Sequence, residues 1–261
     1  MIYYLVINKV RKTEKIMKNE ESLITKKITY QESDFVGYYR LANLFSTLSD
    51  LATKNGRLTG IWQEELEGRY GWILTKQTIK LFRPIKINEE VTFTTRAGKS
   101  SRIKFTRLYD IFDSHGICIG GVYSTWTFID IQKRKIIRPE IVGVNIPEIE
   151  EHKHAVEKYE EIKNTVDLEL VAERVVSYSD LDINQHMNNY RYLEWALDVM
   201  DCKLFNTYYI SEASVNFKKE MLVGTKAKIF YGINDLYFKV RIVSEDNSTE
   251  HFEMGGYLRK G

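Results

Sequence analysis

The chain has 261 residues, of which 43% are hydrophobic, and a formal net charge of +2. This length allows one large domain or two domains of ordinary size, and the hydrophobic content is sufficient for a substantial core. A net charge this small gives no general attraction for nucleic acid, so we expect no nucleic-acid partner. No apolar run is long enough to span a bilayer, and we expect no membrane insertion.

Residues 1–25 show neither the pattern of a folded unit nor that of a targeting segment. Only six apolar residues, from Ile2 to Ile7, precede the first polar ones. The segment has no signal-peptide cleavage site, and it lacks the Arg- and Ser-rich composition of a transit peptide. We therefore expect an N-terminal arm of peripheral importance, a cytoplasmic protein, and translation that starts at either Met1 or Met17.

The first half of the chain, residues 26–146, predicts one helix followed by strands. From Arg40 to Lys54 the apolar residues recur at helical spacing, which indicates an amphipathic helix. Strand-like segments separated by turn residues follow at 72–82, 90–98, 102–112 and 117–130.

The second half, residues 167–261, repeats this order. A strand at 170–178 precedes a helix from Asn189 to Met200. Further strand-like segments follow at 208–218, 225–232, 236–244 and 251–258. The repeated order indicates an internal duplication, and the two halves can be overlaid with Leu81 on Phe217 and Pro84 on Glu220.

Residues 147–166 are rich in charge and lie between the two halves, so we interpret them as a linker, partly helical. The predicted fold is α+β, with two tandem hotdog domains, each a central helix wrapped by an antiparallel β-sheet. The alternative is a plain α+β fold in which the similarity of the halves is a coincidence.

The stretch SDLDINQHMNNYRYLEW, from Ser179 to Trp195, is unusually polar before it becomes aromatic. Asp182, Asn184 and His186 are two residues apart, so an extended segment would place them on one face. A carboxylate there could orient the histidine, and an amide could hold a substrate oxygen. The segment also precedes a helix, whose free N–H groups can stabilise an oxyanion. The structural alternative is an ordinary turn with a helix cap, which Asp and Asn favour.

A comparison with the first half supports the interpretation of this stretch as a chemical site. Ser33-Asp34 precedes the first helix much as Ser179-Asp180 precedes the second, and the equivalent place then reads Val36, Tyr38 and Arg40. A requirement of the turn alone should apply to both halves. The comparison therefore predicts one chemical site, in the second half.

The stretch closely resembles the active-site motif of the acyl-acyl-carrier-protein (acyl-ACP) thioesterases of plants and bacteria. ANLFSTLSDLA and GWILTKQTIKLFRPIKINEEV resemble the N-terminal part of that family, and the resemblance covers roughly residues 28–258. It implies tandem hotdog domains and hydrolysis of the thioester between a fatty acyl chain and acyl carrier protein (ACP), which ends chain elongation. The implied partner is ACP with its acyl-phosphopantetheine arm. A homodimer of two such chains is a further association that we leave open.

The resemblance implies the catalytic residues Asp182, Asn184, His186 and Glu220. The family's glutamate is followed by a cysteine, whereas this chain has Met221 at that place. A thioether cannot form a thiolate, so a cysteine nucleophile is disfavoured. We therefore expect direct attack by water, with Glu220 as the base and His186 positioning or sharing the proton.

Other roles follow from the same resemblance. Asn184 and the backbone N–H groups after His186 would hold the thioester carbonyl, and Asp182 would fix a neighbour. We expect substrate contacts from Asn188 and Asn189 at the helix start, and an acyl pocket lined by residues of the first helix, Leu44, Phe45 and Leu48.

We expect no cofactor and no metal, because the remaining histidines lack the spacing of ligands. Cys118 and Cys202 are far apart in the sequence and are expected to be reduced thiols. Three basic clusters are either solvated surface or a docking surface for ACP; they are Lys76, Lys80, Arg83 and Lys86; Lys99, Arg102, Lys104 and Arg107; and Lys133, Arg134 and Lys135.

Three other functions remain open on this fold. The first is hydrolysis of acyl-CoA by a hotdog thioesterase. The second is a non-catalytic acyl-binding regulatory protein, which would not need the aligned Asp, Asn, His and Glu. The third is a dehydratase, which nothing in the sequence favours.

Overall fold

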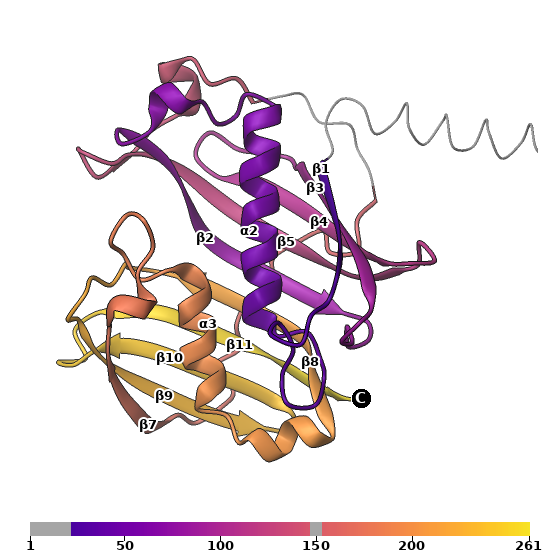
Figure 1. Ribbon diagram of the computed structural model, residues 1–261. Helices are drawn as coiled ribbons and strands as arrows, with labels where there is room; N and C mark the ends of the chain where they lie inside the picture. Colours follow the sequence, from indigo (N-terminus) through magenta and orange to yellow (C-terminus); the bar gives the residue numbers. More distant parts are fainter. Residues whose placement is uncertain (1–21, 147–152) are drawn as a thin grey trace, which may run out of the picture.

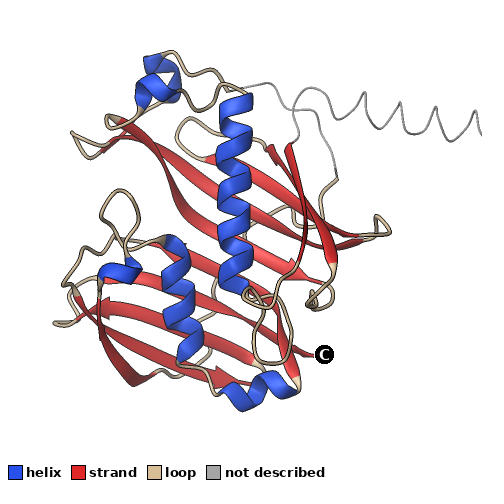
Figure 2. Cartoon of the chain, viewed as in Figure 1, coloured by secondary structure: helices blue, strands red, loops and turns tan. Residues whose placement is uncertain are grey.

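The computed structural model describes residues 22–146 and 153–261, and these form strands and helices from both halves (Figure 2). The first half contains β1 (Ser22–Lys27), α2 (Leu41–Leu58), β2 (Tyr70–Leu81), β3 (Glu90–Ala97), β4 (Phe105–Asp113), β5 (Cys118–Asp130) and β6 (Lys135–Ile136). The second contains β7 (Glu169–Val175), α3 (Asn189–Asp198), β8 (Tyr208–Phe217), β9 (Lys226–Asn234), β10 (Tyr237–Ser244) and β11 (Glu250–Lys260). Short 3-10 helices lie at Glu64–Leu66, Pro139–Val142, Tyr178–Asp180 and Cys202–Asn206.

The predicted helices and strand segments are confirmed. The apolar stripe of the first helix is buried against the sheet, at Leu41, Leu44, Phe45, Leu48, Leu51 and Ala52. The second helix begins at Asn189 as predicted and ends two residues before Met200. Each predicted strand segment coincides with one of the long strands, because the alternation of apolar and polar residues matches the two faces of a sheet.

The prediction of an arm over residues 1–25 is wrong at its C-terminal end. Residues Ser22–Lys27 form β1, which pairs with β3 from Ser22 opposite Thr95 to Lys27 opposite Glu90. This strand is short and mostly polar, so its hydrophobic pattern is weak, and pairing with the edge of the sheet determines its structure. Residues 1–21 lie outside the described residues.

All these strands belong to one antiparallel sheet. The strand order is β1-β3-β4-β5-β2 in the first half and β7-β9-β10-β11-β8 in the second, so the two halves share one topology. They join where β2 pairs with β8, from Lys76 opposite Asn216 to Lys80 opposite Glu212. At the centre of this seam a buried hydroxyl pair, Thr78 Oγ1 and Ser214 Oγ, lies 2.8 Å apart.

The helices α2 and α3 lie side by side on one face of the sheet and contact each other (Figure 1). Between them and the sheet lies a core that runs through both halves. Phe45 of α2 contacts Phe217 of β8, with ring centroids 5.8 Å apart. The first helix therefore packs directly against the strand that leads to Glu220.

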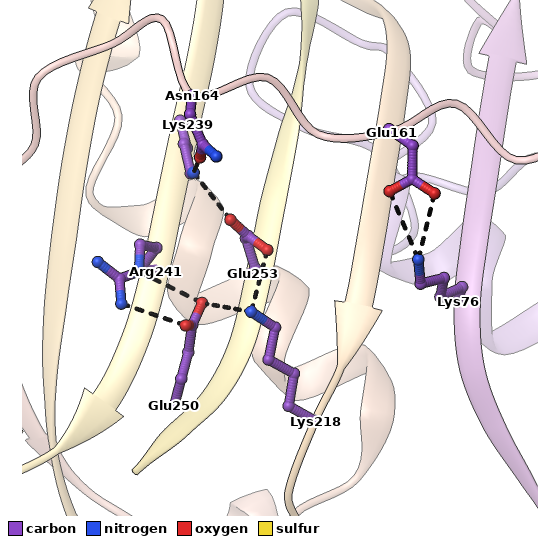
Figure 3. Close-up of polar contacts among 8 residues, drawn as sticks. All are labelled: Lys76, Glu161, Asn164, Lys218, Lys239, Arg241, Glu250 and Glu253. Carbon is purple, nitrogen blue, oxygen red and sulfur yellow. Dashed lines mark hydrogen bonds and ion pairs between the residues drawn. The ribbon is translucent and has the colours of Figure 1, made fainter. Parts of the chain in front are cut away.

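The linker crosses the opposite face of the sheet (Figure 3). In β2, Ile79 and Leu81 belong to the core, whereas Lys76 and Lys80 alternate with them and meet the linker acids. Lys80 Nζ lies 2.9 Å from Glu160, and Lys76 Nζ lies 3.4 Å from Glu161.

The prediction that the linker is partly helical is wrong over 153–166, which is irregular. A helix would bond the backbone amides of this segment internally, whereas the irregular path leaves the amides of Glu160 and Lys163 to donate to the hydroxyls of Thr78 and Tyr237 on the sheet. Gly121 of β5 permits this close approach, because a Cβ there would lie 2.7 Å from Cβ of Ala155. Residues 147–152 lie outside the described residues.

Candidate active site

The segment before α3 is a closed turn rather than the extended strand expected from the two-residue spacing. The amide of Asp182 donates to the carbonyl of His186 at 2.8 Å, and Leu181 forms a bridge with Met187. Gln185 has a φ of 63°, in the left-handed region. The expectation that Asp182, Asn184 and His186 share one face of an extended segment is therefore wrong.

Asp182 closes this turn with its side chain. Its Oδ1 accepts hydrogen bonds from the amides of Asn184 at 2.8 Å and His186 at 3.1 Å. These contacts are to backbone groups, and they use the tendency of aspartate to bond with amides two residues on. Asp182 therefore fixes the neighbouring backbone, as the resemblance implied that it would fix a neighbour.

The first half contains the same turn. Asp34 Oδ1 accepts from the amides of Val36 at 3.0 Å and Tyr38 at 2.8 Å, and the amide of Asp34 donates to the carbonyl of Tyr38. Gly37 takes the left-handed position, with a φ of 83°. The counterparts of Asp182, Asn184 and His186 are therefore Asp34, Val36 and Tyr38.

The sequence overlay of Val36, Tyr38 and Arg40 on the motif was thus wrong by two residues. The aspartate is common to both halves, as a requirement of the turn should be. The amide of Asn184 and the imidazole of His186 are what distinguish the second half, because a valine and a tyrosine replace them in the first.

His186 lies beside Glu220. Nδ1 of His186 and Oε2 of Glu220 are 3.6 Å apart, and about one third of each side chain is exposed. This distance allows an ion pair when the imidazole is protonated, and a small rotation would bring the two groups into hydrogen-bonding contact. The sequence prediction that these two side chains belong to one site agrees with this proximity.

Two loops are held together to produce this proximity. The amide of Met187 donates to the carbonyl of Met221 at 2.8 Å, and His186 forms a bridge with Leu222. The amide of Met221 donates to the hydroxyl of Tyr192, a residue of α3, at 3.0 Å. Burial raises the pKa of this Tyr192 hydroxyl, so it stays neutral.

Met221 is buried in the core, with 1% of its surface exposed. Its thioether packs at the place where the resemblance implies a cysteine, and a thioether supplies no thiolate nucleophile. Of the two cysteines, Cys118 lies at the start of β5, and burial raises the pKa of its thiol. Cys202 is exposed in the short helix that follows α3.

The start of α3 offers fewer free N–H groups than expected. Asn188 caps the helix, because its side chain accepts a hydrogen bond from the amide of Tyr190. The amide of Asn188 itself donates to the carbonyl of Asp180, and that of Met187 is bound to Met221. The expectation that the backbone N–H groups directly after His186 hold a carbonyl is therefore wrong for these two positions.

The residues expected to line an acyl pocket lie deep in the core. Leu44, Phe45 and Leu48 are each 1% exposed on α2. They face the sheet and pack among side chains of both halves. Their role in holding an acyl chain stays a prediction.

One residue at the site was missed by the sequence analysis as a site residue. Arg134, in the turn between β5 and β6, forms an ion pair with Oε1 of Glu220 through Nη2. This arginine belongs to the first half of the chain and Glu220 to the second. The only sequence signal was its place in the basic cluster from Lys133 to Lys135, which says nothing about Glu220.

Two structural searches of the described ranges bear on cofactors and membranes. Across 22–146 and 153–261, no three His, Cys, Asp or Glu side chains are gathered in the manner of metal ligands. In the same ranges, no helix combines the length and apolar character needed to cross a bilayer.

Comparison with known proteins places both halves in one family. The sequence model of the acyl-ACP thioesterase N-terminal domain matches residues 24–143, and that of the C-terminal domain matches residues 161–256. A curated relative is the chloroplastic acyl-[acyl-carrier-protein] hydrolase FATB3 of Cuphea viscosissima, which is 25% identical over 163 residues. The match covers 57% of this chain and 38% of the relative, so the chain aligns with less than half of that protein.

Solved structures resemble the fold over nearly its whole length. An acyl-ACP thioesterase from Bacteroides thetaiotaomicron is similar with a TM-score of 0.82 and 24% identity, covering 92% of this chain and 98% of that one. The 12:0-ACP thioesterase of Umbellularia californica gives a TM-score of 0.77 and 16% identity, with coverage of 92% and 98%. At these identities the likeness establishes the fold.

Proposed function

The chain belongs to the acyl-ACP thioesterase family, and on this premise we propose that it hydrolyses fatty acyl-ACP to a free fatty acid and ACP. The observation that carries the proposal is the proximity of His186 and Glu220, 3.6 Å apart at the start of α3. A histidine beside a carboxylate brings two groups that can accept and donate protons to one site, and such groups serve in general acid–base catalysis. Hydrolysis would end elongation of the acyl chain.

In the proposed reaction, water attacks the thioester carbonyl carbon. Glu220 accepts the proton of the water, with His186 positioning the water or sharing the proton. A C–O bond forms, and the carbonyl oxygen carries the negative charge in the tetrahedral intermediate. When the intermediate collapses, the C–S bond breaks and the departing thiolate takes up the proton. The products are the fatty acid and the free thiol of the phosphopantetheine arm.

The developing oxyanion needs hydrogen-bond donors. The side-chain amide of Asn184 is exposed at the turn, and its Nδ2 makes only a long contact of 3.4 Å with Asp182. We propose that this amide turns to the thioester oxygen, joined by the backbone amide of Asn189. Asp182 contributes by holding the turn in which Asn184 and His186 lie.

The two halves are joined in one sheet, in which β2 of the first half pairs with β8 of the second. We propose that each half is a hotdog domain, over 26–146 and 167–261, in which a helix packs on a five-stranded antiparallel part of the shared sheet. The first half has Val36 and Tyr38 in place of Asn184 and His186, and its helix α2 would bind the acyl chain. ACP is the proposed partner. A cytoplasmic location and a homodimer remain predictions.

The test of this function uses the purified chain and acyl-ACPs of increasing acyl length, with release of free fatty acid as the measurement. The same acyl chains on coenzyme A form the second arm. Faster hydrolysis on ACP supports the proposal, whereas faster hydrolysis on coenzyme A would favour an acyl-CoA thioesterase. No hydrolysis on either carrier would favour a non-catalytic acyl-binding protein.

The residue assignment makes the first prediction. Glu220→Gln and His186→Ala should each lower kcat by about 100- to 10,000-fold, the usual contribution of a general acid or base. Both side chains are partly exposed, so the thermal midpoint should change little. Steady-state kinetics and circular dichroism measure the two effects.

A matched control separates the water mechanism from a thiol mechanism. The double variant Cys118→Ala, Cys202→Ala should keep wild-type kcat. Loss of activity in this folded double variant, or full activity in Glu220→Gln, contradicts the assignment.

A further inference from the structure

The first half of the chain contributes a cation to the site in the second half. Glu220 has two carboxylate oxygens, and each faces a different group. Oε1 pairs with Nη2 of Arg134, while Oε2 faces Nδ1 of His186 at 3.6 Å. The guanidinium and the imidazole therefore lie on either side of one carboxylate.

Hydrogen bonds hold the turn that carries Arg134. Asp130, buried at the end of β5, accepts a hydrogen bond from the amide of Lys133 through Oδ1 at 2.9 Å. The amide of Arg134 donates to the carbonyl of Ile131, and Asp130 pairs with Lys135 on β6. The buried aspartate thus fixes where the turn points.

Arg134 occupies a backbone conformation that does not favour arginine. Its φ of 51° lies in the left-handed region, where glycine or asparagine fits at lower cost. About 75% of the side chain is exposed, so packing does not explain the residue type. The ion pair with Glu220 can offset the unfavourable backbone conformation of Arg134, and it accounts for an arginine at this position.

The place of the guanidinium excludes one obvious role, which is binding of the phosphate on the substrate arm. An extended phosphopantetheine arm is about as long as four residues of extended polypeptide, which is roughly 14 Å from phosphate to sulfur. The proposed reaction places the thioester at Glu220 and His186. A group in direct contact with Glu220 is therefore at the reacting end of the arm, not at its phosphate.

We propose that Arg134 is a positioning residue, which holds the Glu220 carboxylate so that its free oxygen faces His186 and the attacking water. This inference rests on the proposed hydrolysis. Arginine suits this place because its planar fork fixes the carboxylate in orientation as well as in distance. The second-half site is then complete only when the β5–β6 turn of the first half lies against it.

The experiment compares Arg134→Gln, Arg134→Lys and Lys135→Gln in the full chain. Lys135 is the adjacent exposed cation, so its removal changes the local charge equally without touching Glu220. Arg134→Gln should lower kcat by about 10- to 100-fold with little change in KM, as expected when a reacting group is slightly misplaced. Arg134→Lys should restore part of kcat, and Lys135→Gln should leave kcat unchanged.

Two further measurements distinguish positioning from carrier docking. With a small acyl thioester of N-acetylcysteamine, which has no phosphate or carrier, the loss in kcat of Arg134→Gln should persist. Added guanidinium ion, at millimolar concentration, should partly rescue Arg134→Gln and leave Lys135→Gln unchanged.

The opposite results overturn the inference. A rise in KM shared by Arg134→Gln and Lys135→Gln, seen only with acyl-ACP, identifies docking instead. Wild-type kcat in Arg134→Gln shows that the cation has no part in the reaction. Inactivity of the wild-type chain on every thioester is a different result, because it defeats the proposed function itself.

Discussion

In the turn before α3, residues that are close together in the sequence have different roles, one structural and the others chemical. Asp182 bonds to the amides of Asn184 and His186, and Asp34 makes the equivalent bonds in the first half. These aspartates hold backbone in place. The imidazole of His186 and the carboxylate of Glu220 face each other instead, and they are groups that can exchange protons.

A pair of substitutions tests this division. Asp34→Ala and Asp182→Ala should each lower the free energy of unfolding by about 1–3 kcal/mol, because each removes a charged acceptor shared by two amides. Asp34→Ala should keep wild-type kcat, whereas Asp182→Ala should also lower kcat, since its turn positions His186. Urea denaturation and kinetics provide the measurements. Equal losses of kcat in both variants would contradict separate roles.

The sequence indicated His186 through the resemblance and the overlay of the halves, and Glu220 through the resemblance alone. The overlay paired Asp34 with Asp180 instead of Asp182, because the second half has two aspartates only two residues apart. Asp182 is the counterpart of Asp34, and the left-handed residue three positions later marks this alignment, as Gly37 or as Gln185. That signal is weak in a sequence because glutamine does not usually mark such a conformation.

Arg134 could not be predicted from the sequence. It is one of three adjacent basic residues on an exposed turn, and such clusters usually face solvent. Its neighbour Glu220 is 86 residues away, in the other half of the chain. Only the position of the β5–β6 turn against the end of β8 brings them together.

At the scale of elements, the seam between β2 and β8 depends on a buried polar contact. Thr78 Oγ1 lies 2.8 Å from Ser214 Oγ and also accepts a hydrogen bond from the amide of Glu160 at 2.9 Å. The same hydroxyl therefore joins the two halves and fixes the linker. Buried hydroxyls in such networks are costly to remove from one side only.

Thr78→Val should therefore destabilise the chain by about 1–3 kcal/mol, because it leaves the Ser214 hydroxyl and the Glu160 amide without their partner. The matched control is Thr92→Val, which removes an exposed hydroxyl contact with Thr25 at 2.8 Å and should cost less than about 0.5 kcal/mol. Chemical denaturation of both variants gives the comparison. Equal losses in the free energy of unfolding would show that the Thr78 hydroxyl stabilises the chain no more than an exposed hydroxyl does.

The long elements were predictable because their apolar residues recur with the period of a helix or a strand. β1 and the linker were not, for opposite reasons. The pattern of β1 is too short and polar to stand out, and it becomes a strand by pairing with β3. The charges of residues 153–166 fit a solvated helix equally well, and the contacts of Glu160 and Glu161 with the lysines of β2 are not visible in the sequence.

At the scale of the whole molecule, stability should fall in two steps as the solution is acidified. Burial lowers the pKa of His251 below its usual 6.5, so the unfolded chain binds this proton more readily. Its contribution is complete above pH 6.5 and is lost as the pH falls through that value towards the folded pKa.

The second step belongs to paired carboxylates. Burial opposes ionisation of Glu89, but the hydrogen bond from Arg83 prevails and lowers its pKa below 4.5. Its contribution is present above pH 4.5 and is lost as the pH falls further. Glu250 follows the same logic: burial again raises its pKa, and hydrogen bonds from Arg241 and Lys218 outweigh that effect.

Urea denaturation between about pH 7 and pH 5 isolates the histidine step. His251→Asn keeps a donor for the Lys219 carbonyl, which the wild-type Nδ1 meets at 3.0 Å, and removes the titration. Its free energy of unfolding should change less over this range than that of the wild type. Parallel curves would exclude His251 as the cause of the step.

The linker across the outer face of the sheet has a consequence for how copies of this chain can meet. A sheet with helices on one face can stack another sheet on its free face. Here residues 153–166 already occupy part of that face, and the amide of Lys163 donates to the hydroxyl of Tyr237 on β10 at 2.7 Å. A second copy that stacked there would have to displace the linker and break its ion pairs. Stacking of a second sheet on the part of the face that the linker covers is therefore disfavoured.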